Sequence, residues 1–259
     1  MKRIVIVGSG NLAEALARAV ARTESLRLVQ ICARNEARAR AVAAIAGTSW
    51  TCDPQRVAPA DLYILAVSDR AVGEAAAALA APAGAAAVHT AGSVPLDALA
   101  PRFARRGVLY PLQTFTQGRP VDFAEIPLFI EASDAAFFAE LETLARTLSR
   151  TVLPADSSRR ALIHLAGVFA CNFVNHAYAL GEAVVRSAGL DFAILKPLIG
   201  ETARKALDAA SPADVQTGPA VRHDAPTLER HERLLSGDEQ LQTLYTAISR
   251  HIWETSKKR

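Results

Sequence analysis

A glycine motif directly after the first apolar run constrains the fold of this chain most strongly. The run Ile4–Val7 has the length and composition of a buried β-strand, and the G-x-G-x-x-A pattern Gly8–Ala13 follows it and opens an alanine-rich helical segment. In such a motif the first glycine makes a tight turn, the second lets the backbone approach a pyrophosphate, and the small last residue lets helix and strand pack closely. The alternative is an ordinary strand–turn–helix connection. We expect a dinucleotide whose phosphates rest on the N-terminus of the helix, with these contact residues: Gly8, Ser9, Gly10, Asn11 and Leu12.

Short apolar runs alternate with helical patterns through the first half of the chain. The strand-like runs are Ile4–Val7, Leu26–Ala33, Thr48–Thr51, Leu62–Val67, Ala85–His89 and Val108–Tyr110, and the helical segments are Leu12–Arg22, Glu36–Ile45 and Ala71–Ala80. After an irregular stretch come a further apolar run, a helix over Ala135–Leu148 and a short run before Pro154. This alternation predicts βαβ units, and hence an α/β fold with a Rossmann-type, doubly wound, mostly parallel sheet over residues 1–154.

Strand signals almost disappear beyond Pro154. Helices are expected over Ser157–Ser187, Phe192–Leu207, Thr227–Leu235 and Asp238–Glu254. We therefore predict an all-helical C-terminal domain over residues 155–259.

Bulk composition narrows the class of protein. The chain has 259 residues, of which 51% are hydrophobic and 21% charged, with a formal net charge of +3. This charge is too small to indicate nucleic acid or an anionic membrane as a partner. The most apolar later stretch, Ala161–Ala179, contains two histidines and two asparagines that would be costly in lipid. Three widely spaced cysteines match neither a disulfide framework nor a metal site, so we expect a cytoplasmic protein without a metal.

The residues after the second strand distinguish the two nicotinamide cofactors. A site for NAD needs a carboxylate there to bind the ribose 2′-hydroxyl, but the sequence reads Cys32-Ala33-Arg34-Asn35. A guanidinium can instead hold a 2′-phosphate through charge-assisted hydrogen bonds. We expect Arg34 to bind the 2′-phosphate. Asn35 should cap the next helix and face the same phosphate, and Arg38 should lie one helical turn further along. The alternative is a solvated helix start. The pattern favours NADP (NADPH) over NAD.

Polar residues follow the next three strands, at the edge of the sheet where ligands bind. Val67, Ser68 and Asp69 should pass beside the cofactor, although Asp69 can equally be a helix N-cap. His89 is a candidate catalytic residue, with a structural role as the alternative. Ser93 and Gln113 are candidate substrate ligands, because each follows a strand end and can bond a ligand oxygen.

The long helix carries a polar stripe. His164, Val168, Asn172 and Asn175 recur at helical spacing on one face, together with Ala179 and Glu182. An imidazole can donate a proton near neutral pH, so His164 and Asn172 are candidate catalytic residues, and Asn175 is a candidate substrate ligand. The alternative is a polar seam inside a dimer interface.

A stiff loop between Pro219 and Pro226 contains Arg222, His223 and Asp224. Arg222 can clamp a substrate carboxylate, or it can pair with Asp224 and pin the loop.

With these motifs in view, the chain resembles the Rossmann-like NADP oxidoreductases with a C-terminal helical domain of unknown function. These are distant relatives of pyrroline-5-carboxylate reductase and of the beta-hydroxyacid dehydrogenases. The matching segments are Gly8–Ala13, Ala66–Asp69, His89–Ser93, Tyr110–Phe115, His164–Asn175 and Thr217–Asp224. The resemblance implies NADP binding and a homodimer built through the helical domain. The chain departs from the family pattern at His223, where glycine is usual.

The expected function is therefore an NADP-dependent oxidoreductase that transfers a hydride to a small carbonyl or imine substrate. A hydroxyacid-type dehydrogenase is one alternative, but the resemblance puts Val168 where those enzymes carry a catalytic lysine. A non-catalytic NADP(H)-binding sensor or scaffold is the other.

Overall fold

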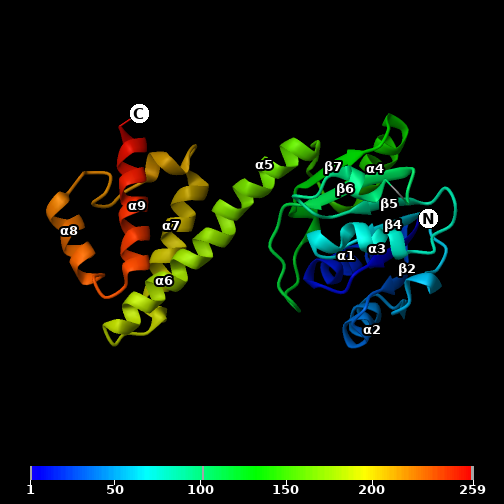
Figure 1. Ribbon diagram of the computed structural model, residues 1–259, viewed down its shortest axis with the longest axis horizontal. Helices are drawn as coiled ribbons and strands as arrows, with labels where there is room; N and C mark the ends of the chain where they lie inside the picture. The colour runs from blue at the N-terminus through cyan, green and yellow to red at the C-terminus, as the bar shows by residue number, and fades with distance from the viewer. Residues whose placement is uncertain (1, 101, 258–259) are drawn as a thin grey trace. The chain divides into compact units, whose positions relative to one another are not determined.

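The computed structural model describes residues 2–100 and 102–257, and within them eight strands form one sheet (Figure 1). The strands are β1 (Lys2–Val7), β2 (Leu26–Cys32), β3 (Ser49–Thr51), β4 (Leu62–Leu65), β5 (Ala86–His89), β6 (Arg105–Pro111), β7 (Leu128–Ala132) and β8 (Val152–Pro154). Their order is β3-β2-β1-β4-β5-β6-β7-β8, and every neighbouring pair is parallel except β6 and β7. The strand order reverses between β1 and β4, which confirms the predicted doubly wound, mostly parallel sheet.

Helices cover both faces of the sheet because alternate strand residues point to opposite sides. In β1, Ile4 and Ile6 join one core cluster with α1 (Asn11–Ala21), α2 (Glu36–Ile45) and α4 (Ala135–Leu148). Val5 and Val7 join the other cluster with α3 (Val72–Ala78). Each of these helices lies within two residues of its predicted segment.

A helical region follows the sheet, as predicted. Its helices are α5 (Ser157–Gly167), α6 (Val174–Ser187), α7 (Lys196–Asp208), α8 (Ala225–Leu234) and α9 (Glu239–Ser256). The predicted long helix is present as α5 and α6, but the segment Val168–Phe173 between them is π-helical. Its hydrogen bonds therefore span five residues instead of four, and the predicted polar stripe loses its α-helical spacing there.

The chain divides into two compact units, Met1–His176 and Ala177–Arg259. The first unit holds the sheet, α5 and the π-helical segment, so most candidate site residues lie within it. The functional boundary at residue 154 remains a prediction. Among the described residues no helix is both long and apolar enough to cross a membrane.

Candidate functional site

The glycine turn after β1 has the geometry that the motif predicts. Gly8 has a φ of +126°, and a Cβ atom there would lie 2.2 Å from the carbonyl oxygen of Ala66. Only glycine fits this position. Gly10 is different, because it is the N-cap of α1 and a Cβ there would have no neighbour within 4 Å. The turn therefore leaves open space over the N-terminus of α1, where backbone N–H groups can bind an anion.

A cleft of about 570 Å³ opens beside this turn. It is lined by the turn, by the residues that follow β2 and β4, and by α3. The predicted cofactor ligands that line it are Gly8, Ser9, Gly10, Arg34, Asn35, Val67 and Ser68. Cys52, Pro54 and Glu74 also line it, and the sequence patterns did not single them out. A cleft of this size at the reversal of strand order suits part of a dinucleotide.

Arg34 is well placed for a second phosphate group. It lines the cleft and is exposed, and it makes no hydrogen bond or ion pair with any residue that the structure describes. No carboxylate stands between Cys32 and Asn35 to bind a free 2′-hydroxyl instead. The residues present therefore fit a phosphorylated adenosine ribose.

Asn35 and Arg38 hold the start of α2 in place. The side chain of Asn35 accepts a hydrogen bond from the backbone N–H of Arg38 at 3.0 Å, which is the predicted helix cap. The guanidinium of Arg38 donates to the carbonyl oxygen of Ser9 at 3.2 Å and to the carboxylate of Glu14 at 3.0 Å. Arg38 is therefore committed to the glycine turn and does not line the cleft, although the sequence places it on the same helix face as the phosphate ligands.

Glu14 is a buried carboxylate that ties α1 to its surroundings. It accepts hydrogen bonds from Arg18 at 3.1 Å, from Arg38, and from the backbone N–H of Gly118 at 3.3 Å. Burial alone would raise the pKa of Glu14, but the hydrogen bonds from Arg38 and Arg18 outweigh it and hold the pKa below its ordinary value. The spacing of four residues between Glu14 and Arg18 suits an ion pair on one helix face, whereas the other partners of Glu14 are distant in sequence.

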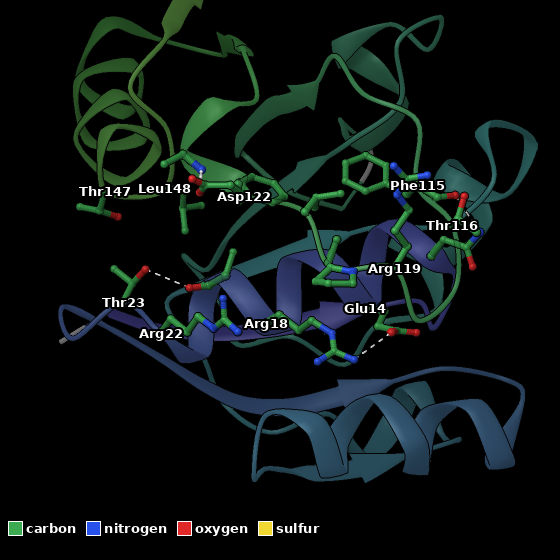
Figure 2. A pocket seen from close by; sticks show the side chains of 17 residues that line it. Glu14, Arg18, Arg22, Thr23, Phe115, Thr116, Arg119, Asp122, Thr147 and Leu148 are labelled. Carbon is green, nitrogen blue, oxygen red and sulfur yellow. Dashed lines mark hydrogen bonds and ion pairs between the residues drawn. The ribbon is translucent and has the colours of Figure 1, made fainter. Parts of the chain in front are cut away.

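A second cavity, of about 200 Å³, is lined in part by Glu14, which does not line the larger cleft. Figure 2 shows Glu14 and Arg18 paired on α1, with Phe115 and Arg119 on the opposite wall. Asn11, at the start of α1, also lines this cavity, and its side-chain amide donates to the carbonyl oxygen of Phe115 at 2.9 Å. Leu12 packs half-buried against the core. Neither side chain lines the larger cleft, so only their backbone N–H groups remain as candidate phosphate ligands.

The polar cluster after β4, β5 and β6 continues from the cleft. Asp69 follows the cleft residue Ser68 and accepts a hydrogen bond from the hydroxyl of Ser93. Both residues are exposed. Because Asp69 binds Ser93, its side chain does not cap the short helix that it begins. The contact joins the end of β4 to the turn after β5.

Tyr110 and His164 meet above that turn. The hydroxyl of Tyr110 lies 3.1 Å from Nδ1 of His164, and the two rings are in edge contact. Gly92 packs directly under the imidazole, since a Cβ atom there would lie 2.7 Å from Nδ1. His164 is half-buried and so remains accessible. Gln113 is exposed, and its side chain accepts a hydrogen bond from the backbone N–H of Thr114 at 2.8 Å.

His89 lies beneath the same turn and is fully buried. Its Nδ1 accepts a hydrogen bond from the backbone N–H of Ala91 at 3.2 Å, and the backbone carbonyl of Pro95 interacts with the ring and slightly opposes the fall in its pKa. Burial and the nearby Arg160 lower its pKa to about 4. The imidazole is therefore neutral near pH 7 and out of reach of a substrate, which favours the structural role.

Arg160 is a buried residue that the sequence patterns did not indicate. Its guanidinium binds the carboxylate of Glu131, the carbonyl oxygen of Val94 and the hydroxyl of Ser157. None of its side chain is exposed. This network fixes the start of α5 against β7 and the turn after β5, and it thereby places His164 over Gly92.

Asn172 and Asn175 lie further along the helical run. Asn172 falls within the π-helical segment and Asn175 at the start of α6, and both are exposed. Neither has a hydrogen-bond partner among the residues described. No hydrogen bond joins them to the Tyr110–His164 pair in the described part of the chain, and their proposed roles stay predictions.

The loop before α8 lies in the second unit. Asp224 caps α8 through the backbone and hydroxyl groups of Thr227, and Arg222 is exposed with no ion pair to a described residue. Those hydrogen bonds, and to a lesser degree the charge of Arg222, lower the pKa of Asp224. His223 adopts a φ of +51°, which explains why glycine suits this position, and its ring stacks on Trp253 at 4.4 Å.

Two family models match the chain in succession. Residues 3–91 match the family described as NADP oxidoreductase, coenzyme F420-dependent, and residues 126–252 match a domain of unknown function. No curated protein matches the chain.

Solved structures extend these matches over both units. A protein from Bacteroides fragilis, named "putative NADP oxidoreductase", is 43% identical over 98% of each chain, with a TM-score of 0.90. A reductive aminase from Aspergillus terreus in complex with NADPH is 17% identical over 100% of this chain and 93% of its own, with a TM-score of 0.65. A pyrroline-5-carboxylate reductase from Coxiella burnetii is 16% identical over 99% and 98%, with a TM-score of 0.57. The last two similarities establish a shared fold. The chain belongs to the family of NADP oxidoreductases in which a Rossmann domain for NADP is followed by a helical domain of unknown function.

Proposed function

We propose that this protein is an NADPH-dependent reductase of a small carbonyl or imine compound. The proposal rests on one observation: within the first unit, the nucleotide cleft is connected through neighbouring residues to the Tyr110–His164 pair, which can carry a proton. The cleft reaches Ser68, the next residue Asp69 binds Ser93, and the adjacent Gly92 supports His164. A reduction needs a hydride and a proton at one carbon–heteroatom bond, and these two groups of residues provide for both.

We assign cofactor binding to the glycine turn, to Arg34 and to the residues after β4. Bound NADPH supplies the hydride. Backbone N–H groups at the start of α1 hold the pyrophosphate, Arg34 holds the 2′-phosphate, and Val67 and Ser68 form the opposite wall. His164 then donates the proton to the substrate, with Ser93 as a hydrogen-bonding group beside it.

The hydroxyacid-dehydrogenase alternative lacks its base. Val168 has no ionisable group at the position where the resemblance requires a lysine amine, and Asn172 lies in the π-helical segment. We therefore favour reduction without a lysine.

We further propose that the protein acts as a homodimer through its helical region. From Ala161 to Lys257, Ala220 is the one buried residue among those described. Large apolar side chains remain exposed throughout, as with Phe169 at 60%, Leu198 at 64% and Leu207 at 83%. Helices without a core of their own need a covering surface, and exposed apolar patches of this kind mark subunit interfaces. In a dimer, Asn172, Asn175 and Arg222 become candidate ligands for substrate. The cytoplasmic location remains a prediction from the cysteine count.

Turnover separates this function from a non-catalytic NADPH sensor. The full chain is mixed with NADPH and a panel of cyclic imines, amine–ketone mixtures and simple ketones, and NADPH oxidation is followed by absorbance at its reduced-nicotinamide band. We expect oxidation with at least one member, and its loss in His164→Gln with unchanged NADPH affinity. Tight NADPH binding without turnover of any member would favour the sensor.

A further inference from the structure

The Tyr110–His164 contact carries an inference about how the proton is delivered, and this inference rests on the proposed function. We propose that Tyr110 is a positioning residue for His164: its hydroxyl keeps the ring proton on Nε2 and replaces that proton once it has moved to the substrate. The donor atom of the site is then Nε2 of His164, and Nδ1 faces Tyr110.

The two side chains come from separate elements of the first unit. Tyr110 lies in β6 and His164 in α5, 54 residues apart, and the hydroxyl is 3.1 Å from Nδ1. Tyr110 is 8% exposed, and its ring also packs against Phe129. The tyrosine is therefore fixed by the core, and the histidine is bound to it.

The direction of this hydrogen bond follows from the surroundings. The Tyr110 hydroxyl has no other hydrogen-bond partner among the described residues. If it accepted a hydrogen from Nδ1, its own hydrogen would be left without an acceptor in a mostly buried place, which is unfavourable. Burial and the charge of Asp69 both raise the pKa of Tyr110, so the hydroxyl keeps its hydrogen at neutral pH. Tyr110 therefore donates to Nδ1, and the neutral ring carries its proton on Nε2.

Gly92 holds the ring against Tyr110 from below. A methyl group at Gly92 would lie 2.7 Å from Nδ1 and 2.8 Å from Cγ of His164, so any larger residue would push the imidazole away. A hydrogen bond from the guanidinium of Arg160 to the carbonyl oxygen of Val94 holds the turn that contains Gly92. The other charged or titratable groups around the pair include His89 under the turn, Asp69 beside Ser93, and Arg160, whose charge lowers the pKa of Tyr110 against the effect of burial and Asp69.

The proton balance closes without a further reactant. As the hydride bonds to the substrate carbon, the electron pair of the C=O or C=N bond moves to the oxygen or nitrogen. That atom takes the proton from Nε2, while Nδ1 takes the proton of the Tyr110 hydroxyl. The ring stays neutral throughout and never becomes an imidazolate. After the product leaves, Nδ1 returns its proton to the tyrosinate and Nε2 takes one proton from water, which restores the starting tautomer and supplies the single proton that the reduction consumes.

Ring-nitrogen NMR of the nucleotide-free protein tests the tautomer. With ¹⁵N-labelled histidine in the full chain, His164→Gln identifies the His164 signals among those of the six histidines. We expect Nδ1 of His164 to show the shift of an unprotonated nitrogen and Nε2 that of a protonated one. In Tyr110→Phe the two shifts should move towards each other as the tautomers mix. Tyr63→Phe is a matched control, because it removes another buried tyrosine hydroxyl, which donates to the carbonyl oxygen of Ala58 at 2.9 Å.

A proton on Nδ1 in the wild type, or His164 signals that Tyr110→Phe leaves in place, would overturn the inference. With a turned-over substrate, Tyr110→Phe should lower kcat about 10²-fold or more at an unchanged KM for NADPH, whereas Tyr63→Phe should keep the wild-type kcat. Equal kcat values for Tyr110→Phe and wild type would contradict the proton supply. If no substrate is turned over, the proposed function fails, and the NMR result still decides the tautomer.

Discussion

Replacing Gly8 with alanine tests whether the turn after β1 has the strained geometry that the fold requires. Two penalties add at this position. A residue with a Cβ is disfavoured in the left-handed region by roughly 1–2 kcal/mol, and the φ of +126° lies well outside the small region that such residues tolerate. The new Cβ would also lie 2.2 Å from the carbonyl oxygen of Ala66, and relieving such an overlap by backbone movement costs about 1–3 kcal/mol.

The sum is about 2–5 kcal/mol, a large part of the 5–15 kcal/mol that stabilises an ordinary domain. For a protein of this size each kcal/mol lowers the Tm by about 2–4 °C, so the fall should be roughly 4–20 °C. Circular dichroism melts and urea unfolding of the nucleotide-free protein measure both quantities.

Gly10→Ala is the matched control, because a Cβ there meets nothing within 4 Å and the backbone is not left-handed. It should leave the nucleotide-free Tm within about 2 °C of wild type, since surface substitutions away from special features change stability by about 0.5 kcal/mol or less. It should still weaken NADPH binding, because the methyl group fills the space over the helix N-terminus. A Gly8→Ala protein as stable as Gly10→Ala would refute the reasoning about this turn.

Three further predictions concern stability and assembly. Because burial and Arg160 lower the pKa of His89 to about 4, the unfolded chain binds one more proton than the folded chain between that pH and about 6.5. The free energy of unfolding should therefore fall by about 2–3 kcal/mol as the pH drops from above 6.5 towards 4. Urea unfolding at pH 7 and at pH 4.5 measures this loss, which should be smaller in His89→Gln than in wild type. An equal loss in the two proteins would contradict the pKa shift. Glu131→Gln should destabilise the fold by about 2–4 kcal/mol, because it leaves Arg160 buried without its carboxylate. The control Glu125→Gln breaks an exposed pair with Arg150 and should change stability by about 1 kcal/mol or less. Similar losses for both variants in urea unfolding would argue against the buried network. Light scattering should give twice the chain mass of 27.5 kDa, and Leu198→Glu on α7 should shift the protein towards the monomer; a wild-type monomer at micromolar concentration would exclude the proposed dimer.

Local patterns were sufficient to predict most of the fold. The continuous apolar run in β1 and the motif after it predict the observed turn, and the Asn35 cap of α2 follows from residue type alone. The π-helical segment Val168–Phe173 was not predicted, because its residues are ordinary in helices and the change from i→i+4 to i→i+5 hydrogen bonds leaves no local sequence signal.

The site was predictable where its residues belong to one sequence motif or follow adjacent parallel strands. Arg34 and Gly8 lie near each other because adjacent parallel strands end at the same edge of the sheet, as expected. The role of Arg38 depends on Glu14, which is 24 residues away, and the position of His164 depends on Gly92 and Tyr110. Such pairs form only when α1 meets α2 and when α5 packs on the sheet edge, so spacing rules for one helix or strand do not reveal them.

The most direct test of the cofactor assignment is a titration of wild type and Arg34→Asp with NADPH and with NADH, followed by intrinsic fluorescence. A hydrogen-bonded charge pair contributes about 1.5–3 kcal/mol. The preference for NADPH, measured as the Kd for NADH divided by the Kd for NADPH, should therefore fall by about 10- to 150-fold in the variant. The Kd for NADH itself should stay about the same or decrease. An unaltered preference for NADPH in Arg34→Asp would contradict the assignment of the 2′-phosphate to this guanidinium.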